Sequence, residues 1–255
     1  MSTNTIHQCM SKTDINALYG EFKDEVAETR DYVRKNLVSG TREEDLYKGT
    51  MILYSELFYK PDFLFVGINP GAGYYNTSGK KFRDDELEAE DGFEYLLAGE
   101  DYPDYRSAEQ TRTAFARTKY KGSLSKSVKT NLFYTSTSSL KAMRELFGIL
   151  DNKFNIDYYA KSLNWTKKLI GIIEPKVIIC EGKVVANTLA EYYEVEPQWN
   201  QETATFQIEG KIQVLGYKRL FSNIRNINGF VEALNNLQDA FTTPIQSSPL
   251  PRVAR

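Results

Sequence analysis

Two asparagines are the residues of this sequence best suited to chemistry on a bound ligand. Asn69 lies in Gly67-Ile68-Asn69-Pro70-Gly71, directly after an apolar run, and Asn131 follows Thr130 in a second strand-like stretch. A side-chain amide offers an acceptor and a donor side by side, so it can hold a water molecule or match the edge of a base. The plainer interpretations are that Asn69 lies in a tight turn and that Asn131 bonds to a neighbouring loop.

A buried strand must position Asn69. The run from Phe63 to Ile68 is almost wholly apolar, which is typical of a strand covered on both faces in the middle of a parallel sheet. Pro70 has no N–H group and Gly71 favours a turn, so the strand ends there. In open α/β sheets ligands bind just past the carboxyl ends of the strands. We therefore expect Asn69 at the lip of a pocket.

The rest of the chain alternates between strand and helix patterns. Further strands are predicted over 129–136, 176–180, 203–208 and 211–215, and helices over 13–39, 41–55, 107–119, 138–147, 157–173, 184–193 and 226–241. This alternation predicts an α/β fold, a three-layer α/β/α sandwich around a central, mostly parallel four-stranded sheet. We expect one domain overall, with an N-terminal helical segment over 1–60, the α/β core over 61–241 and a tail over 242–255.

Composition narrows the class of protein. The 255 residues carry a formal charge of −2, with a pI of about 5.7, which argues against a surface that attracts nucleic acid everywhere but leaves room for a local basic groove. The cysteines, Cys9 and Cys180, and one histidine, His7, are too few for an iron–sulfur cluster and make a zinc site improbable. We expect reduced thiols, no metal or other cofactor, no membrane span and a cytoplasmic protein, monomeric by default.

Three stretches resemble the uracil-DNA glycosylase superfamily. Residues 67–71 match, letter for letter, the first motif of its mismatch-specific uracil/thymine branch, Thr130-Asn131-Leu132 resembles the strand that reads uracil, and residues 173–183 resemble a helix–proline–strand–glycine segment. The resemblance implies hydrolysis of the N-glycosidic bond of uracil, or of a related damaged or mismatched base, in DNA. The chain departs from the family at residues 216–223, where the second motif, His-Pro-Ser or Asn-Pro-Ser, is missing.

The resemblance also implies roles for individual residues. Asn69 would hold the attacking water, and Asn131 would read the base edge. Tyr74 or Tyr75 would stack on the base, while Gly71 leaves space for a substituent at C5. The remaining expected contacts are Gly67, Ile68 and Pro70 around the base, Lys218 and Arg219 on phosphates, and Leu220 and Phe221 as a wedge in the base stack.

Two other functional classes stay open. The missing second motif and the acidic pI also suit a glycosylase-fold protein with weak or no catalysis that binds a nucleobase, nucleotide or DNA. A third hypothesis makes the aromatic-rich stretch over 74–105 a surface for a protein partner. The first class predicts base release, the second binding without turnover, and the third no binding to nucleic acid even at low salt.

Overall fold

A six-stranded sheet forms the centre of the protein. The computed structural model describes residues 12–69, 87–88, 93–97, 106–220 and 223–237. The strand order is β2-β1-β3-β6-β5-β4, in which the first four strands are parallel, β5 runs antiparallel to β6, and β4 runs antiparallel to β5. The strands are β1 (Phe63–Gly67), β2 (Val128–Asn131), β3 (Val177–Glu181), β4 (Gln198–Asn200), β5 (Thr203–Ile208) and β6 (Ile212–Tyr217). A separate short hairpin pairs β7 (Arg219–Leu220) with β8 (Asn223–Ile224).

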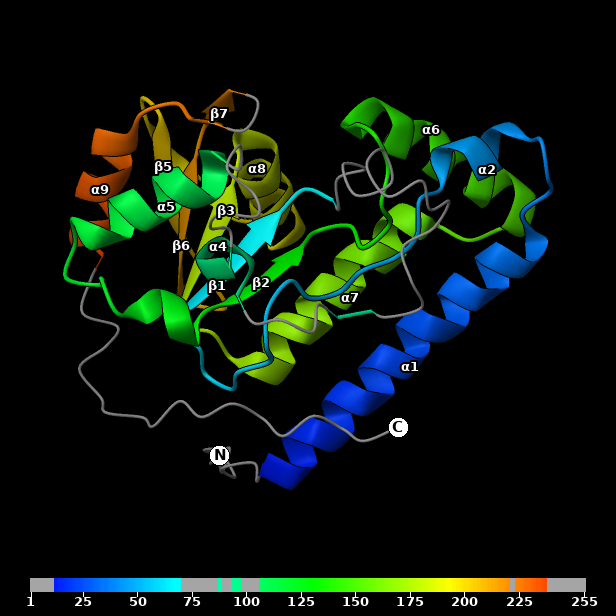
Figure 1. The fold of residues 1–255 in the computed structure, drawn as a ribbon, viewed down its shortest axis with the longest axis horizontal. Coiled ribbons are helices and arrows are strands. Elements are labelled where there is room, and N and C mark those ends of the chain that lie inside the picture. The colour runs from blue at the N-terminus through cyan, green and yellow to red at the C-terminus, as the bar shows by residue number, and fades with distance from the viewer. Residues whose placement is uncertain (1–11, 70–86, 89–92, 98–105, 221–222, 238–255) are drawn as a thin grey trace, which may run out of the picture.

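Helices cover both faces of the sheet and make the fold a three-layer α/β/α sandwich (Figure 1). On one face, Leu64 and Val66 pack in a core with α6, α7 and α8, and on the other, Phe63 and Phe65 pack in a core with α4, α5 and α9. The helices are α1 (Lys12–Asn36), α2 (Arg42–Leu46), α4 (Glu94–Leu97), α5 (Arg106–Ala116), α6 (Leu140–Phe154), α7 (Tyr158–Ile173), α8 (Lys183–Tyr192) and α9 (Ile227–Asn235), with a 3-10 turn over Ser123–Lys126. The fold class predicted from sequence is confirmed.

Helix α1 adds an outer element beside α7 (Figure 1). Its buried face carries Ile15, Phe22 and Val26 at helical spacing. Trp165 of α7 donates its indole N–H to Glu25 at 2.8 Å, which ties the two helices together. No helix within the described ranges is both long and apolar enough to cross a membrane.

Several details differ from expectation. The strand predicted over 129–136 ends at Asn131, and the helix predicted over 138–147 continues through Gly148 to Phe154. The sheet has six strands rather than four, because the hairpin of β4 and β5 extends the parallel part through β6. The helix predicted over 41–55 ends at Leu46. Beyond it, backbone N–H groups bond to another segment: Lys48 to Ser136 O at 3.0 Å and Met51 to Tyr134 O at 2.9 Å. These tertiary hydrogen bonds satisfy the backbone in place of a helix.

The connections after the central strands leave the sheet on different faces. The chain leaves β1 toward α4 and α5 on one face and leaves β2 and β3 toward α6–α8 on the other. In open α/β sheets such a change of face at the carboxyl ends of neighbouring strands is the usual location of a ligand site.

Candidate functional site at the carboxyl ends of the parallel strands

Four residues on one face close the four parallel strands. Asn131 ends β2, Gly67 ends β1, Glu181 ends β3 and Tyr217 ends β6. Gly67 is in register with Asn131, and Glu181 with Tyr217. Since alternate residues of a strand share a face, all four belong to the face covered by α4, α5 and α9. We call Asn131, Gly67, Glu181 and Tyr217 the carboxyl-end row.

Gly67 leaves space that its neighbours fill. A Cβ atom built on Gly67 would lie 2.3 Å from Oδ1 of Asn131 and 3.4 Å from Oε2 of Glu181. The first distance is too short for any real contact, so only glycine lets the Asn131 amide lean over β1. Asn131 is only 6% exposed, and its side-chain amide keeps some contact with solvent, where it can bond to water or to a ligand.

Behind this amide lies a buried ion pair. Lys129, two residues before Asn131 on the same face of β2, places Nζ 2.5 Å from Oε2 of Glu181 and 2.9 Å from the hydroxyl of Tyr95. Tyr95 of α4 in turn donates its hydroxyl to Oε1 of Glu181. Lys129 and Glu181 are 5% and 4% exposed. With Arg219, described next, these residues form what we call the Glu181 cluster.

Arg219 reaches the cluster from the β7–β8 hairpin. Its Nη2 donates to Oγ of Ser107 in α5 at 3.0 Å, and its side chain passes close to Gly182, directly after Glu181. The Arg219 guanidinium is near enough to act electrostatically on both Glu181 and Tyr217. Arg219 thus points back across the carboxyl end of β3 and belongs to the site rather than to the outer surface.

The charges in the cluster fix the ionisation of its acidic groups. Burial raises the pKa of Glu181, but the attraction of Lys129 and Arg219 outweighs it, so the net pKa lies below the ordinary value of 4.5. Glu181 is therefore ionised at neutral pH. Burial, and then the Glu181 charge, raise the pKa of Tyr217 well above 10.0, so its phenol stays protonated.

Asn69 lies two residues beyond β1 and is half-buried, and a hydrogen bond to Thr137 fixes the orientation of its side-chain amide. Its Nδ2 donates to Oγ1 of Thr137 at 3.0 Å, and that hydroxyl donates to the carbonyl of Ser139 at 3.0 Å. Because the Thr137 proton goes to Ser139, Thr137 must accept from Asn69, which sets the NH2 group toward Thr137 and Oδ1 toward the opposite side. Ile68 continues the ladder, since its carbonyl accepts from Phe133 N at 3.0 Å.

The segment after β6 carries the other predicted residues that the structure describes. We call its described residues, 218–220 and 223–225, the rim. Lys218 lies 3.7 Å from Glu202, and Arg225 lies 3.6 Å from the same carboxylate. Leu220, at the end of β7, is 58% exposed, more than any other large apolar side chain in the described residues. The remaining predicted contacts fall outside those residues: Pro70, Gly71, Tyr74, Tyr75 and Phe221.

Asn69, Asn131 and Arg219 were named as site residues from the sequence, but Glu181 and Tyr95 of the Glu181 cluster were not. Glu181 closes the apolar run 177–180, and Lys129 precedes Thr130 in a strand that is buried throughout. A charged residue inside or closing a buried strand is the signal that was available, because such groups are buried only when paired. Tyr95 gave no such signal, since its role depends on where α4 packs.

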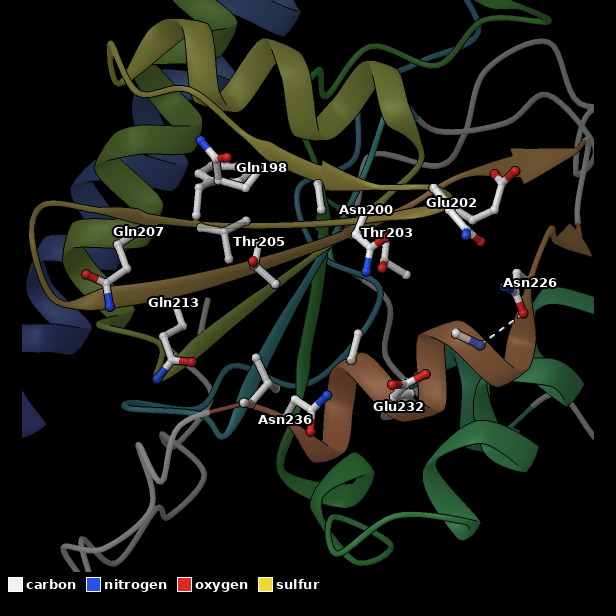
Figure 2. Close-up of a pocket in the computed structure, with 17 residues that line it drawn as sticks. Gln198, Asn200, Glu202, Thr203, Thr205, Gln207, Gln213, Asn226, Glu232 and Asn236 are labelled. Carbon is white, nitrogen blue, oxygen red and sulfur yellow. Dashed lines mark hydrogen bonds between the residues drawn. The ribbon is translucent and has the colours of Figure 1, made fainter.

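A hollow lies between β5 and α9, away from the carboxyl-end row. The groove has a volume of about 690 Å³, and its sides carry mainly amide and hydroxyl side chains. Figure 2 shows Thr203 and Thr205 on the sheet side and Glu232 and Asn236 on the α9 side. Its described lining includes two glutamates and no lysine or arginine, so it suits neutral polar groups and repels phosphate. It does not include the carboxyl-end row.

The chemistry available at the row is hydrogen bonding and electrostatics. Cys180 is buried, with its pKa raised by burial and then by Glu181, and it lies in the core on the other face of the sheet, so it is no thiolate nucleophile. Among the described residues, no group of three or more His, Cys, Asp or Glu side chains could hold a metal ion. What the row offers is the nearly buried amide of Asn131, the oriented amide of Asn69 nearby and a cluster that contains Lys129, Arg219 and Glu181.

No family model matches the chain, and no curated protein matches it.

Proposed function

We propose that the carboxyl-end row binds a uracil-type base extruded from DNA and that the protein hydrolyses its N-glycosidic bond. The observation that carries the proposal is the Asn131 amide, which is 6% exposed at the carboxyl end of β2 and leans over Gly67, where an added Cβ atom would displace it. An amide pairs its acceptor with the N3–H of uracil and its donor with O4.

Asn69 supports the hydrolytic part. The bonds through Thr137 to Ser139 fix the Asn69 NH2 group toward Thr137 and turn Oδ1 to the opposite side, the orientation that an acceptor for a positioned water needs. An amide is a poor base, so this site works by placing the water rather than by taking its proton. Slow turnover is the expected consequence.

The rim supports DNA as the carrier of the base. Lys218 and Arg225 lie beside the exposed Leu220, and Lys183 begins α8 nearby on the carboxyl side of β3. Cations contact phosphates, and an apolar tip can fill the gap left by an extruded base. Because Glu202 already neutralises part of this charge, affinity should be modest, and it should fall as the salt concentration rises.

The test is base release by the purified protein. Substrates are oligonucleotides with one uracil in single-stranded form, opposite adenine and opposite guanine, and one with thymine opposite guanine, and the released base is quantified by chromatography. Asn69→Ala is expected to lower the rate of base release about 10²-fold through loss of water positioning. Asn131→Ala is expected to lower kcat/KM by roughly 10- to 100-fold through loss of base recognition.

A matched control is Asn152→Ala, an exposed asparagine of α6 that only bonds to the Gly148 carbonyl. It should retain wild-type activity. Wild-type protein that releases no base from any of these substrates would remove the hydrolytic proposal. In that case binding of the same DNA, weakened by Asn131→Ala but not by Asn69→Ala, would support the alternative of a protein that binds the base without turnover.

A further inference from the structure

The groove between β5 and α9 has a polar floor built from alternate residues of neighbouring strands. Thr203, Thr205 and Gln207 line the groove from one face of β5, because alternate residues of a strand point to the same side. The register gives each of them an amide neighbour on the adjacent strand: Asn200 beside Thr203, Gln198 beside Thr205 and Gln213 beside Gln207. The floor is therefore a ladder of amide and hydroxyl groups with one rung at every second residue.

Helix α9 supplies the wall of the groove. Its apolar side, with Phe230 and Leu234, is buried in the core, while Gly229 lines the groove without a side chain. Glu232 and Asn236, one helical turn apart, face the same hollow from the wall (Figure 2). Floor and wall together offer hydrogen-bond donors and acceptors on two sides of a space of about 690 Å³.

The groove carries negative charge that a ligand can match. Its described lining contains Glu202 and Glu232 and no lysine or arginine. Glu202 already has cationic neighbours outside the groove, since Lys218 lies 3.7 Å and Arg225 3.6 Å from its carboxylate. The exposed Glu232 has no cation beside it in the described lining, so a positively charged ligand group can pair with it. This charge disfavours phosphates and carboxylates and favours a cation.

An extended peptide matches this arrangement better than a sugar does. Its backbone N–H and C=O groups repeat every two residues, as the rungs of the floor do. Each side-chain amide can accept from a peptide N–H and donate to a peptide C=O. The six residues of β5 make a floor about 20 Å long, the length of a six-residue extended segment. A sugar ring packs its apolar side on an aromatic face, but Phe206, the aromatic residue of the described lining, is only 9% exposed.

We propose that the groove between β5 and α9 binds an extended peptide segment of another protein, one that carries a lysine or arginine. The amides of the floor and of Asn236 hold its backbone, and Glu232 pairs with its cation. The inference does not depend on the proposed function, because the groove excludes the carboxyl-end row. Since every residue has the backbone groups that the amides recognise, affinity depends on charge and backbone more than on sequence, and one simple peptide can test it.

The probe is a capped hexapeptide of alternating threonine and lysine, added to the full-length protein without DNA. In nitrogen-15 NMR of the side-chain NH2 groups, the signals of Gln207 and Asn236 should shift, while those of Asn131 and Asn152, outside the groove, should stay in place. Fluorescence anisotropy of the labelled peptide gives the Kd.

Two matched peptides separate charge from backbone recognition. A peptide of threonine and glutamate should bind at least about tenfold more weakly, because its carboxylates face Glu232. The lysine peptide with a fully N-methylated backbone keeps its charges but has no N–H donors, and it should also bind at least about tenfold more weakly.

Variants of the protein test the two walls of the groove separately. Glu232→Gln should weaken binding of the lysine peptide about fivefold through loss of one exposed ion pair. Gln207→Ala should weaken it about fivefold through loss of one backbone contact. Glu191→Gln, an exposed glutamate of α8 on the other face of the sheet, is the matched control and should bind as the wild type does. Circular dichroism and thermal unfolding verify that each variant is folded.

Each outcome decides a part of the proposal. Equal affinity for the lysine and glutamate peptides would overturn the pairing with Glu232. Undiminished binding of the N-methylated peptide would overturn recognition of the backbone. Groove signals that shift with maltohexaose but not with the lysine peptide would assign a sugar site and overturn the peptide, and groove signals that no probe moves would overturn the site itself. None of these results bears on base release, which is measured separately.

Discussion

Replacement of Gly67 by alanine should damage the site far more than the fold. The added Cβ would lie 2.3 Å from Oδ1 of Asn131, about 1 Å inside ordinary contact, so the Asn131 amide must swing away. The atom that clashes is the end of a flexible side chain, so the cost is that of an off-rotamer torsion, about 1 kcal/mol in the free energy of unfolding. A displacement of about 1 Å at a reacting geometry typically lowers activity about 10²-fold.

Two other glycines give matched controls. Gly216→Ala would place its Cβ 2.7 Å from the Cβ of Ala186, which is fixed to the backbone of α8, so overpacking should cost about 2–3 kcal/mol. Gly148→Ala, in α6 with no atom within 4 Å, should stabilise the protein by about 0.5–1 kcal/mol. Urea unfolding gives the three free energies, and uracil release gives the activities.

Two results for Gly67→Ala would contradict this prediction. If Gly67→Ala costs as much stability as Gly216→Ala, Asn131 is not free to move aside. If Gly67→Ala keeps wild-type activity, the position of the Asn131 amide does not matter for function, and the carboxyl-end row is not the reacting site.

Three further predictions concern the cluster and the rim. Lys129→Met and Glu181→Met should each destabilise the protein by about 3–5 kcal/mol, because each removes one partner of a buried ion pair. In urea unfolding, the double variant should lose clearly less free energy of unfolding than the sum of the two single variants, and a loss equal to that sum would argue against a buried pair. The pKa of Glu181 is lower in the folded than in the unfolded protein, so its carboxylate contributes stability above about pH 4.5, and this contribution is lost as the pH falls through the folded-state pKa. The free energy of unfolding, measured from pH 6 to pH 3, should therefore decline less steeply in Glu181→Gln than in the wild-type protein. Leu220→Ala should leave the unfolding free energy within about 0.5 kcal/mol because the side chain is 58% exposed, yet weaken binding to uracil-containing duplex more than to single strands; equal weakening would exclude a wedge.

Local patterns predicted the centre of the fold well because burial dominates there. The apolar runs 63–66 and 177–180 became β1 and β3, buried at every position. The predicted strand over 129–136 put Asn131 near its start, whereas β2 ends at Asn131, so its place at the carboxyl end of a strand came from the structure.

Where tertiary contacts compete with local preference, sequence reasoning failed. The segment after Leu46 has a helix-like start, but its N–H groups bond to the segment beyond β2, and no local pattern reports that pairing. The inward direction of Arg219 is likewise set by Ser107, 112 positions earlier in the chain. An arginine in a turn looks like a surface residue until the partner is known.

The claim on which the account depends is that the Asn131 amide accepts a uracil-type base. Nitrogen-15 NMR of the side-chain amide groups tests it directly, with the Asn131 signal assigned from Asn131→Ala and with DNA that carries a 2′-fluorinated deoxyuridine resistant to cleavage. The account predicts that the Asn131 NH2 signal shifts strongly while those of Gln207 and Asn236, in the groove beside α9, stay in place. A stationary Asn131 signal in DNA-saturated protein, or shifts confined to that groove, would contradict it.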